Sequence, residues 1–77
     1  MITAAQCRAA RALLDWSQQD LADAASIGNA TIRNFEGGKS EPQHATLVVL
    51  RQTFEAAGIQ FVETGDAARG AGVVLVG

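Results

Sequence analysis

Residues 17–42, SQQDLADAASIGNATIRNFEGGKSEP, constrain the fold more than any other part of this chain, because they place two short helical segments on either side of a brief turn. Gln18–Ala25 forms the first segment. After residues 26–28, which interrupt the pattern, Asn29–Glu36 resumes the helical spacing of apolar residues. The pattern therefore predicts two short helices joined by a turn of about four residues.

The ends of both segments carry residues that start and stop helices. Ser17 precedes the first segment, where its side-chain oxygen can accept the backbone N–H of Asp20. Gly37 and Gly38 follow the second segment, and glycine takes the left-handed conformation of a C-cap without penalty. Pro42 biases the residue before it towards extended backbone, so a loop ends this part of the chain.

Two further helices are expected around this pair. Thr3 and Gln6 have the spacing of a capping box, which predicts a first helix over Ala4–Leu14. Residues 43–57 predict a fourth helix that Gly58 stops. The first helix has an apolar side that should face the core, formed by Cys7, Ala10, Leu13 and Leu14.

After Gly58 the composition changes from helix-forming to strand-forming. Residues 59–62 are rich in β-favouring side chains, residues 64–71 form a polar, turn-rich segment, and residues 72–77 are an apolar run. These features predict two strands joined by a loop of about eight residues. A two-stranded ribbon is marginal alone, so it must pack on the helices, pair with a strand of another chain, or both.

The fold class predicted from these elements is mainly α, with a short β-hairpin at the C-terminus. We expect the chain to divide into a helical part over residues 1–58 and a hairpin over residues 59–77.

Composition excludes several classes of function. No apolar run approaches the roughly 20 residues that span a bilayer, and the N-terminus lacks the apolar core of a secretory signal, so a soluble cytoplasmic protein is expected. The single cysteine, Cys7, and the single histidine, His44, provide neither a metal cluster nor a catalytic triad. We expect no enzymatic activity, metal or cofactor, and we interpret Cys7 as a small buried apolar residue.

The opening stretch resembles the helix-turn-helix of the phage-repressor and Cro-like family, also called the XRE family. The resemblance covers about residues 9–50. The matching positions are Gln18, Leu21, Ala22, Ile27, Thr31, Ile32, Phe35, Glu36, Gly38, Lys39 and Pro42. It implies a four-helix repressor-like domain whose recognition helix, about residues 29–36, enters the major groove of double-stranded DNA. Packing alone explains the apolar matches, so the polar positions carry the functional weight.

The resemblance also assigns roles to the polar residues. The expected base-reading residues are Asn29, Ala30, Arg33 and Asn34, and the expected phosphate-contacting residues are Ser17, Gln18, Thr31 and Lys39. Arg33 has donors for guanine, and either asparagine has the donor and acceptor for adenine. Arg11 and Glu36 match a pair that joins the first helix to the recognition helix, which we interpret as structural. Any solvated helix would also show a polar face.

Two positions depart from the family pattern. Ser26 stands where the turn commonly carries glycine, and a non-glycine residue with positive φ costs about 1 kcal/mol, so a slightly different turn is expected. Gly28 stands where a serine or threonine cap is usual. A side chain that would contact phosphate or base is therefore missing there, which predicts weaker affinity.

The charge balance also limits the expected affinity. The net charge is -2, and within residues 17–42 two positive side chains, Arg33 and Lys39, accompany four negative ones, Asp20, Asp23, Glu36 and Glu41. If Glu36 pairs with Arg11 and both aspartates lie on the far side of the second helix, the DNA face is only modestly positive. We therefore expect one copy to bind DNA weakly, with a shallow salt dependence.

Specific binding then requires two copies on one operator. The apolar segment of Val73, Val74, Leu75 and Val76 would pair with its copy in a homodimer, placing half-sites about one helical turn, roughly 34 Å, apart. The alternative is a hairpin that only folds back on its own helices. The rival function is a protein-interaction or antitoxin-like module that keeps the helical scaffold, binds a protein partner and binds DNA weakly.

Overall fold

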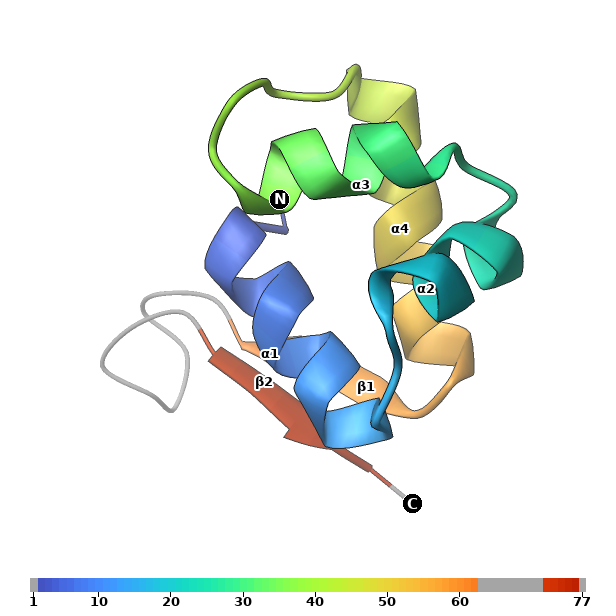
Figure 1. The fold of residues 1–77 in the computed structure, drawn as a ribbon. Helices are drawn as coiled ribbons and strands as arrows, with labels where there is room; N and C mark the ends of the chain where they lie inside the picture. The colour runs from blue at the N-terminus through green and yellow to red at the C-terminus, as the bar shows by residue number, and fades with distance from the viewer. Residues whose placement is uncertain (1, 63–71, 77) are drawn as a thin grey trace.

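The computed structural model describes residues 2–62 and 72–76, and in these residues four helices precede a two-stranded sheet (Figure 1). The helices are α1 (Ala4–Leu14), α2 (Gln18–Ala25), α3 (Asn29–Glu36) and α4 (His44–Ala56), and the strands are β1 (Ile59–Val62) and β2 (Gly72–Leu75). The predicted mainly α fold with a C-terminal hairpin is confirmed. The polar loop expected over residues 64–71 lies outside the described residues. None of the described helices is long and apolar enough to cross a membrane.

Reciprocal caps explain why α1 and α2 begin where they do. Thr3 Oγ1 accepts the N–H of Gln6 at 3.1 Å, and Gln6 Oε1 accepts the N–H of Thr3 at 2.9 Å. Ser17 and Asp20 make the same pair of bonds, each at 2.9 Å. Both capping boxes satisfy N–H groups that have no partner inside the helix, and both predicted caps are confirmed.

The turn between α2 and α3 keeps its left-handed residue although that residue is a serine. Ser26 has φ 56° and ψ 43°, and the N–H groups of Ser26 and Ile27 donate to the carbonyls of Asp23 and Ala22. These bonds close the end of α2. Serine is therefore held in a conformation that costs it about 1 kcal/mol relative to glycine.

Helix α4 is one residue shorter at each end than the sequence predicted. Gln43 has extended backbone, with φ -60° and ψ 154°, so it is the residue before the helix and not its first residue. Ala57 lies after the last helical residue, and Gly58 then reverses the chain with φ 98°. The helix therefore begins and ends one residue inside the predicted range of about 43–57.

The core lies between the helices, and the sheet covers one side of it. Its buried apolar residues are Ile2, Cys7, Ala10, Leu21, Ala22, Ala25, Ile32, Phe35, Leu47, Leu50, Phe54, Ile59 and Phe61. Phe54 is central, because Trp16 stacks on it and Phe61 meets it edge-on, each with ring centroids 6.0 Å away. The hairpin therefore contributes to the same core as the helices.

Leu13 was expected on the inner side of α1 but is 44% exposed. Successive residues of a helix are about 100° apart around its axis, so a side chain next to the inward-facing Leu14 turns well away from the core. Cys7 and Ala10 are fully buried as predicted, and Leu14 packs against the core.

The two strands pair antiparallel, with Ile59 opposite Leu75 and Val62 opposite Gly72. Helix α1 packs against β2, and α4 packs against β1 (Figure 1). The side chain of Gln6 joins α1 to the sheet, since its Nε2 donates to the carbonyls of Gly72 at 3.1 Å and Val62 at 3.4 Å. The hairpin thus folds back on its own helices.

Candidate nucleic-acid interface

Helix α3 divides into a buried side and a polar outer side. Ile32, Phe35 and Glu36 are buried. The expected base-reading residues Ala30, Arg33 and Asn34 are exposed, and Asn29 and Thr31 are half-buried. Lys39 is exposed in the segment that follows the helix. The structure therefore places the outward-pointing part of the predicted site on one continuous helix surface.

The last turn of α3 is fixed by a buried carboxylate. Glu36 is 5% exposed, and Arg11 of α1 binds it in a bidentate pair, with Nη2 to Oε1 and Nε to Oε2 both at 2.7 Å. Gln18 Nε2 of α2 donates to Oε1 at 3.1 Å, and the Cys7 thiol donates to Oε2 at 3.1 Å. One carboxylate therefore joins three helices, and the Arg11–Glu36 pair has the geometry expected of a structural pair.

Two further hydrogen bonds from α1 strengthen this connection between the helices. Arg8 Nη1 donates to the backbone carbonyl of Glu36, at the end of α3 where carbonyls lack helical partners. Arg11 Nη1 donates to the carbonyl of Trp16, at 3.0 Å, in the connection to α2. Sequence reasoning did not assign a role to Arg8. Its position three residues before Arg11, on the same side of α1, was the available signal.

The hydrogen bonds keep the Glu36 carboxylate ionised. Burial opposes the charge of Glu36, but the bonds from Arg11, Cys7 and Gln18 hold its pKa below the ordinary value. The bond to Glu36 raises the pKa of Arg11. Burial raises the pKa of the Cys7 thiol well above its usual range, and the neighbouring carboxylate adds to this rise. Cys7 thus lies buried, as predicted, but also serves as a hydrogen-bond donor.

Acid should destabilise the protein through Glu36. Because its pKa is lower in the folded state, its contribution is fully present above 4.5, the ordinary value, and is lost as the pH falls through the folded pKa. We expect the free energy of unfolding in urea, followed by circular dichroism, to fall as the pH is lowered below about 4.5. The surface variant Glu55→Gln should show the same fall. A wild-type stability that stays constant down to about pH 3 would contradict this role.

Two of the four expected phosphate contacts already have partners within the chain. The Ser17 hydroxyl accepts a bond in its capping box, and the Gln18 amide donates to Glu36. Within residues 2–62 and 72–76, no hydrogen bond engages the side chains of Thr31 or Lys39. Ser17 keeps its hydroxyl hydrogen and Gln18 keeps a second N–H, so all four members of this set can donate to a phosphate without giving up a bond.

The first residue of α3 is tied to α2. Asn29 Nδ2 donates to Gln19 Oε1 at 3.2 Å, and Gln19 Nε2 donates to Asp23 Oδ1 at 2.8 Å. Asp23 therefore lies on the side of α2 that approaches the start of α3. From the sequence, Asp20 and Asp23 were both considered to lie on the far side of α2. For Asp23 this is wrong.

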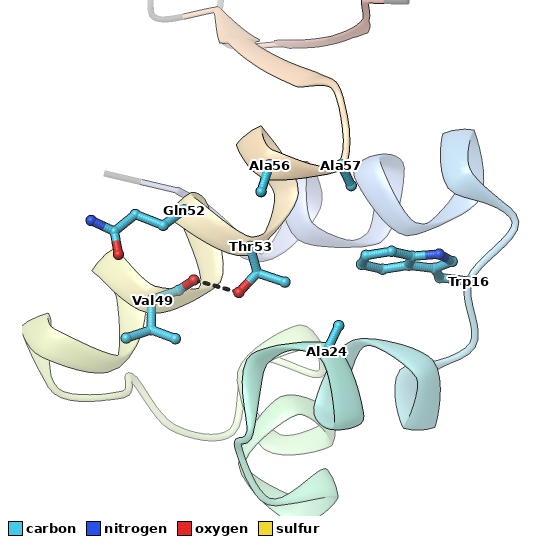
Figure 2. Close-up of a pocket in the computed structure, with 7 residues that line it drawn as sticks. All are labelled: Trp16, Ala24, Val49, Gln52, Thr53, Ala56 and Ala57. Atoms are coloured by element: carbon cyan, nitrogen blue, oxygen red, sulfur yellow. Dashed lines mark hydrogen bonds between the residues drawn. The ribbon is translucent and has the colours of Figure 1, made fainter.

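A shallow groove of about 460 Å³ lies between α2 and α4, away from the outer side of α3. Its lining residues are Trp16, Ala24, Val49, Gln52, Thr53, Ala56 and Ala57. Figure 2 shows the indole ring of Trp16 at one end and Val49 with Gln52 at the other. The Thr53 hydroxyl donates to the Val49 carbonyl at 2.8 Å, so it is satisfied within α4. The groove is uncharged and mainly apolar.

Helices α2 and α3 are short and are joined by a tight turn in which Ser26 has the left-handed conformation, and α3 presents a polar face. These features define a helix-turn-helix domain. Comparison with known families matches residues 8–55, more than half of the chain, to the helix-turn-helix family of Cro/C1 type. The chain therefore belongs to this family, the XRE family of DNA-binding regulators, whose domain is not enzymatic. Comparison with curated proteins finds no match.

Proposed function

We propose that this protein is a sequence-specific regulator of transcription that inserts α3 into the major groove of double-stranded DNA. The observation that carries the proposal is the outer side of α3, where Ala30, Arg33 and Asn34 are exposed while the opposite side is locked into the core. A rigid helix with exposed donors is what base readout requires, because the donors must meet base edges without reordering the backbone. Family membership supports the same proposal.

In this proposal, the bases are read by Asn29, Ala30, Arg33 and Asn34, and the phosphates are contacted by Ser17, Gln18, Thr31 and Lys39. Arg33 is the strongest candidate for specificity, because its guanidinium can donate two bonds to guanine. Ser17 and Gln18 would donate to phosphate through the hydroxyl hydrogen and the second amide N–H, which their bonds to Asp20 and Glu36 leave free.

We further propose that the protein acts as a homodimer through β2, with the hairpin of residues 59–77 as the dimerisation element. Val73 is half-buried and packs against the chain's own core, whereas Val74, Leu75 and Val76 are 47%, 48% and 55% exposed. Within the described residues β2 has one strand partner, β1, so its other edge is available for pairing. Membership of this DNA-binding family supports a cytoplasmic location.

The competing function is a protein-interaction module, such as an antitoxin-like subunit with weak DNA binding. The groove between α2 and α4 favours it, because this mainly apolar hollow contains no residue of α3. The net charge of -2 also suits a protein partner better than a polyanion.

Capture of sheared genomic DNA by the purified protein, at low and moderate salt, followed by sequencing of the bound fragments, tests the proposal. The expected result is enrichment of an inverted repeat whose half-sites lie about one helical turn apart. Enrichment of no sequence at either salt concentration would reject sequence-specific binding.

Two charge-introducing variants test dimerisation through β2. Val74→Lys places a charge on the proposed dimer strand, and we expect it to lose the inverted repeat and to sediment as a monomer. Val49→Lys makes the same change in the groove, at a residue that is 38% exposed, and should leave DNA capture unchanged. Loss of DNA capture in Val49→Lys but not in Val74→Lys would contradict dimerisation through β2.

A further inference from the structure

Asn29, the first residue of α3, is connected to a carboxylate on α2 through one intervening amide. Asn29 donates to Gln19, and Gln19 donates to Asp23. We call these two bonds the amide bridge. Gln19 and Asp23 are exposed and lie one turn apart on α2. Neither residue belongs to the predicted base-reading or phosphate-contacting sets.

The carboxylate determines which way both amides of the bridge point. A carboxylate only accepts hydrogen bonds, so Gln19 must turn its NH2 group towards Asp23. Gln19 then presents its oxygen to Asn29, and Asn29 must donate to this oxygen through its own NH2 group. One N–H of Asn29 is thereby committed. The second N–H remains, as does Oδ1, which no hydrogen bond among the described residues engages.

We propose that Asp23 and Gln19 determine the base specificity of Asn29, by leaving it one donor and one acceptor and thus directing it to adenine. In the major groove adenine presents the N7 acceptor beside the N6 amino donor, which matches this pair. Guanine presents two acceptors, N7 and O6, and therefore requires two donors. Asn29 cannot supply two N–H groups to a base while it donates one to Gln19. This inference rests on the proposed insertion of α3 into the major groove.

The bridge also accounts for an acidic residue beside the DNA-reading helix. Asp23 weakens the attraction of this face for phosphates. Its carboxylate makes the neighbouring amide oxygen a better acceptor, and the effect of both bonds grows when DNA excludes water from them. Asp23 therefore lowers affinity for DNA in general and raises selectivity at one base.

Binding to a randomised library of operator sequences, followed by sequencing of the bound DNA, tests the inference. The base position read by Asn29 is the one whose preference disappears in Asn29→Ala, and we expect adenine there with the wild-type protein. In Gln19→Ala and in Asp23→Asn, the adenine-to-guanine ratio at this position should fall about 3- to 10-fold, the equivalent of one hydrogen bond. Preferences at the other positions should stay unchanged.

Two controls keep the effect of the bridge apart from other effects of substitution. Gln60→Ala removes an exposed glutamine on β1, and Asp15→Asn removes an exposed negative charge after α1. Both should retain the wild-type ratio. Asp15→Asn also shows how much of any rise in total affinity in Asp23→Asn comes from charge alone.

The outcomes distinguish this inference from the proposed function. A clear operator motif, with an unchanged ratio in Gln19→Ala and Asp23→Asn, overturns the role of the bridge and leaves the regulator intact. A preference for guanine at the Asn29 position overturns it as well. A library from which the wild-type protein enriches no sequence overturns the proposed function, and the inference with it.

Discussion

Replacing Glu36 by glutamine should destabilise the protein by about 3 kcal/mol, as expected when one partner of a buried pair is lost. The groups that contact the carboxylate from Arg11, Gln18 and Cys7 are all donors. A glutamine amide has nearly the same shape, but its NH2 group would face one of these donors, and the Arg11 guanidinium would lose its counter-charge. For a domain of this size the melting temperature should fall on the order of 15 °C.

Glu55→Gln is the control for this experiment, because it makes the same change at the surface. Glu55 pairs with Arg51 one turn away at 3.2 Å, with its side chain 46% exposed, and such pairs contribute less than about 1 kcal/mol. Thermal and urea unfolding, both followed by circular dichroism, measure the loss of stability in each of the two variants. Equal losses in the two variants would show that the buried carboxylate has no special role in stability.

Replacing Arg33 by alanine should reduce the preference for the operator while leaving the fold intact, because the side chain is exposed on the outer side of α3. Loss of a bidentate contact to guanine costs about 1 to 3 kcal/mol, which lowers operator affinity roughly 5- to 150-fold. Affinity for unrelated DNA should fall much less. Fluorescence anisotropy with operator and scrambled duplexes, at several salt concentrations, measures both.

Lys39→Ala is the counterpart, since it removes the same charge from an expected phosphate contact. It should weaken binding to operator and scrambled duplexes alike, and it should reduce the slope of log affinity against log salt by about 1. If Arg33→Ala also lowers the two affinities equally, Arg33 contacts phosphate and not a base.

Local signals allowed the helices to be predicted from sequence almost residue by residue. The Thr3–Gln6 and Ser17–Asp20 boxes mark where α1 and α2 begin, and both rest on bonds between residues three positions apart. The end of α4 was less well predicted, because Ala57 is a good helix former that only its backbone geometry excludes from the helix. Leu13 was misplaced because spacing from Ala10 alone does not fix where the centre of the buried side lies.

Contacts between helices were harder to predict, because they depend on how the helix axes cross. The resemblance to the family indicated the Arg11–Glu36 pair, which the structure contains. Nothing in the sequence indicated that Cys7 and Gln18 would donate to the same carboxylate, or that Gln19, and not its neighbour, would reach Asn29. Adjacent residues on a helix face directions about 100° apart, so a small rotation of α2 decides which glutamine meets which partner.

The burial of Cys7 gives the protein an internal reporter of its own opening. It is the single cysteine of the chain, it is fully buried, and its thiol lies between α1 and α3 against Glu36. A thiol reagent can reach the sulfur only after the core around it opens, and the raised pKa keeps the buried sulfur protonated and unreactive until then. The rate of labelling therefore follows the opening of the core around Cys7, and no cysteine has to be introduced to measure it.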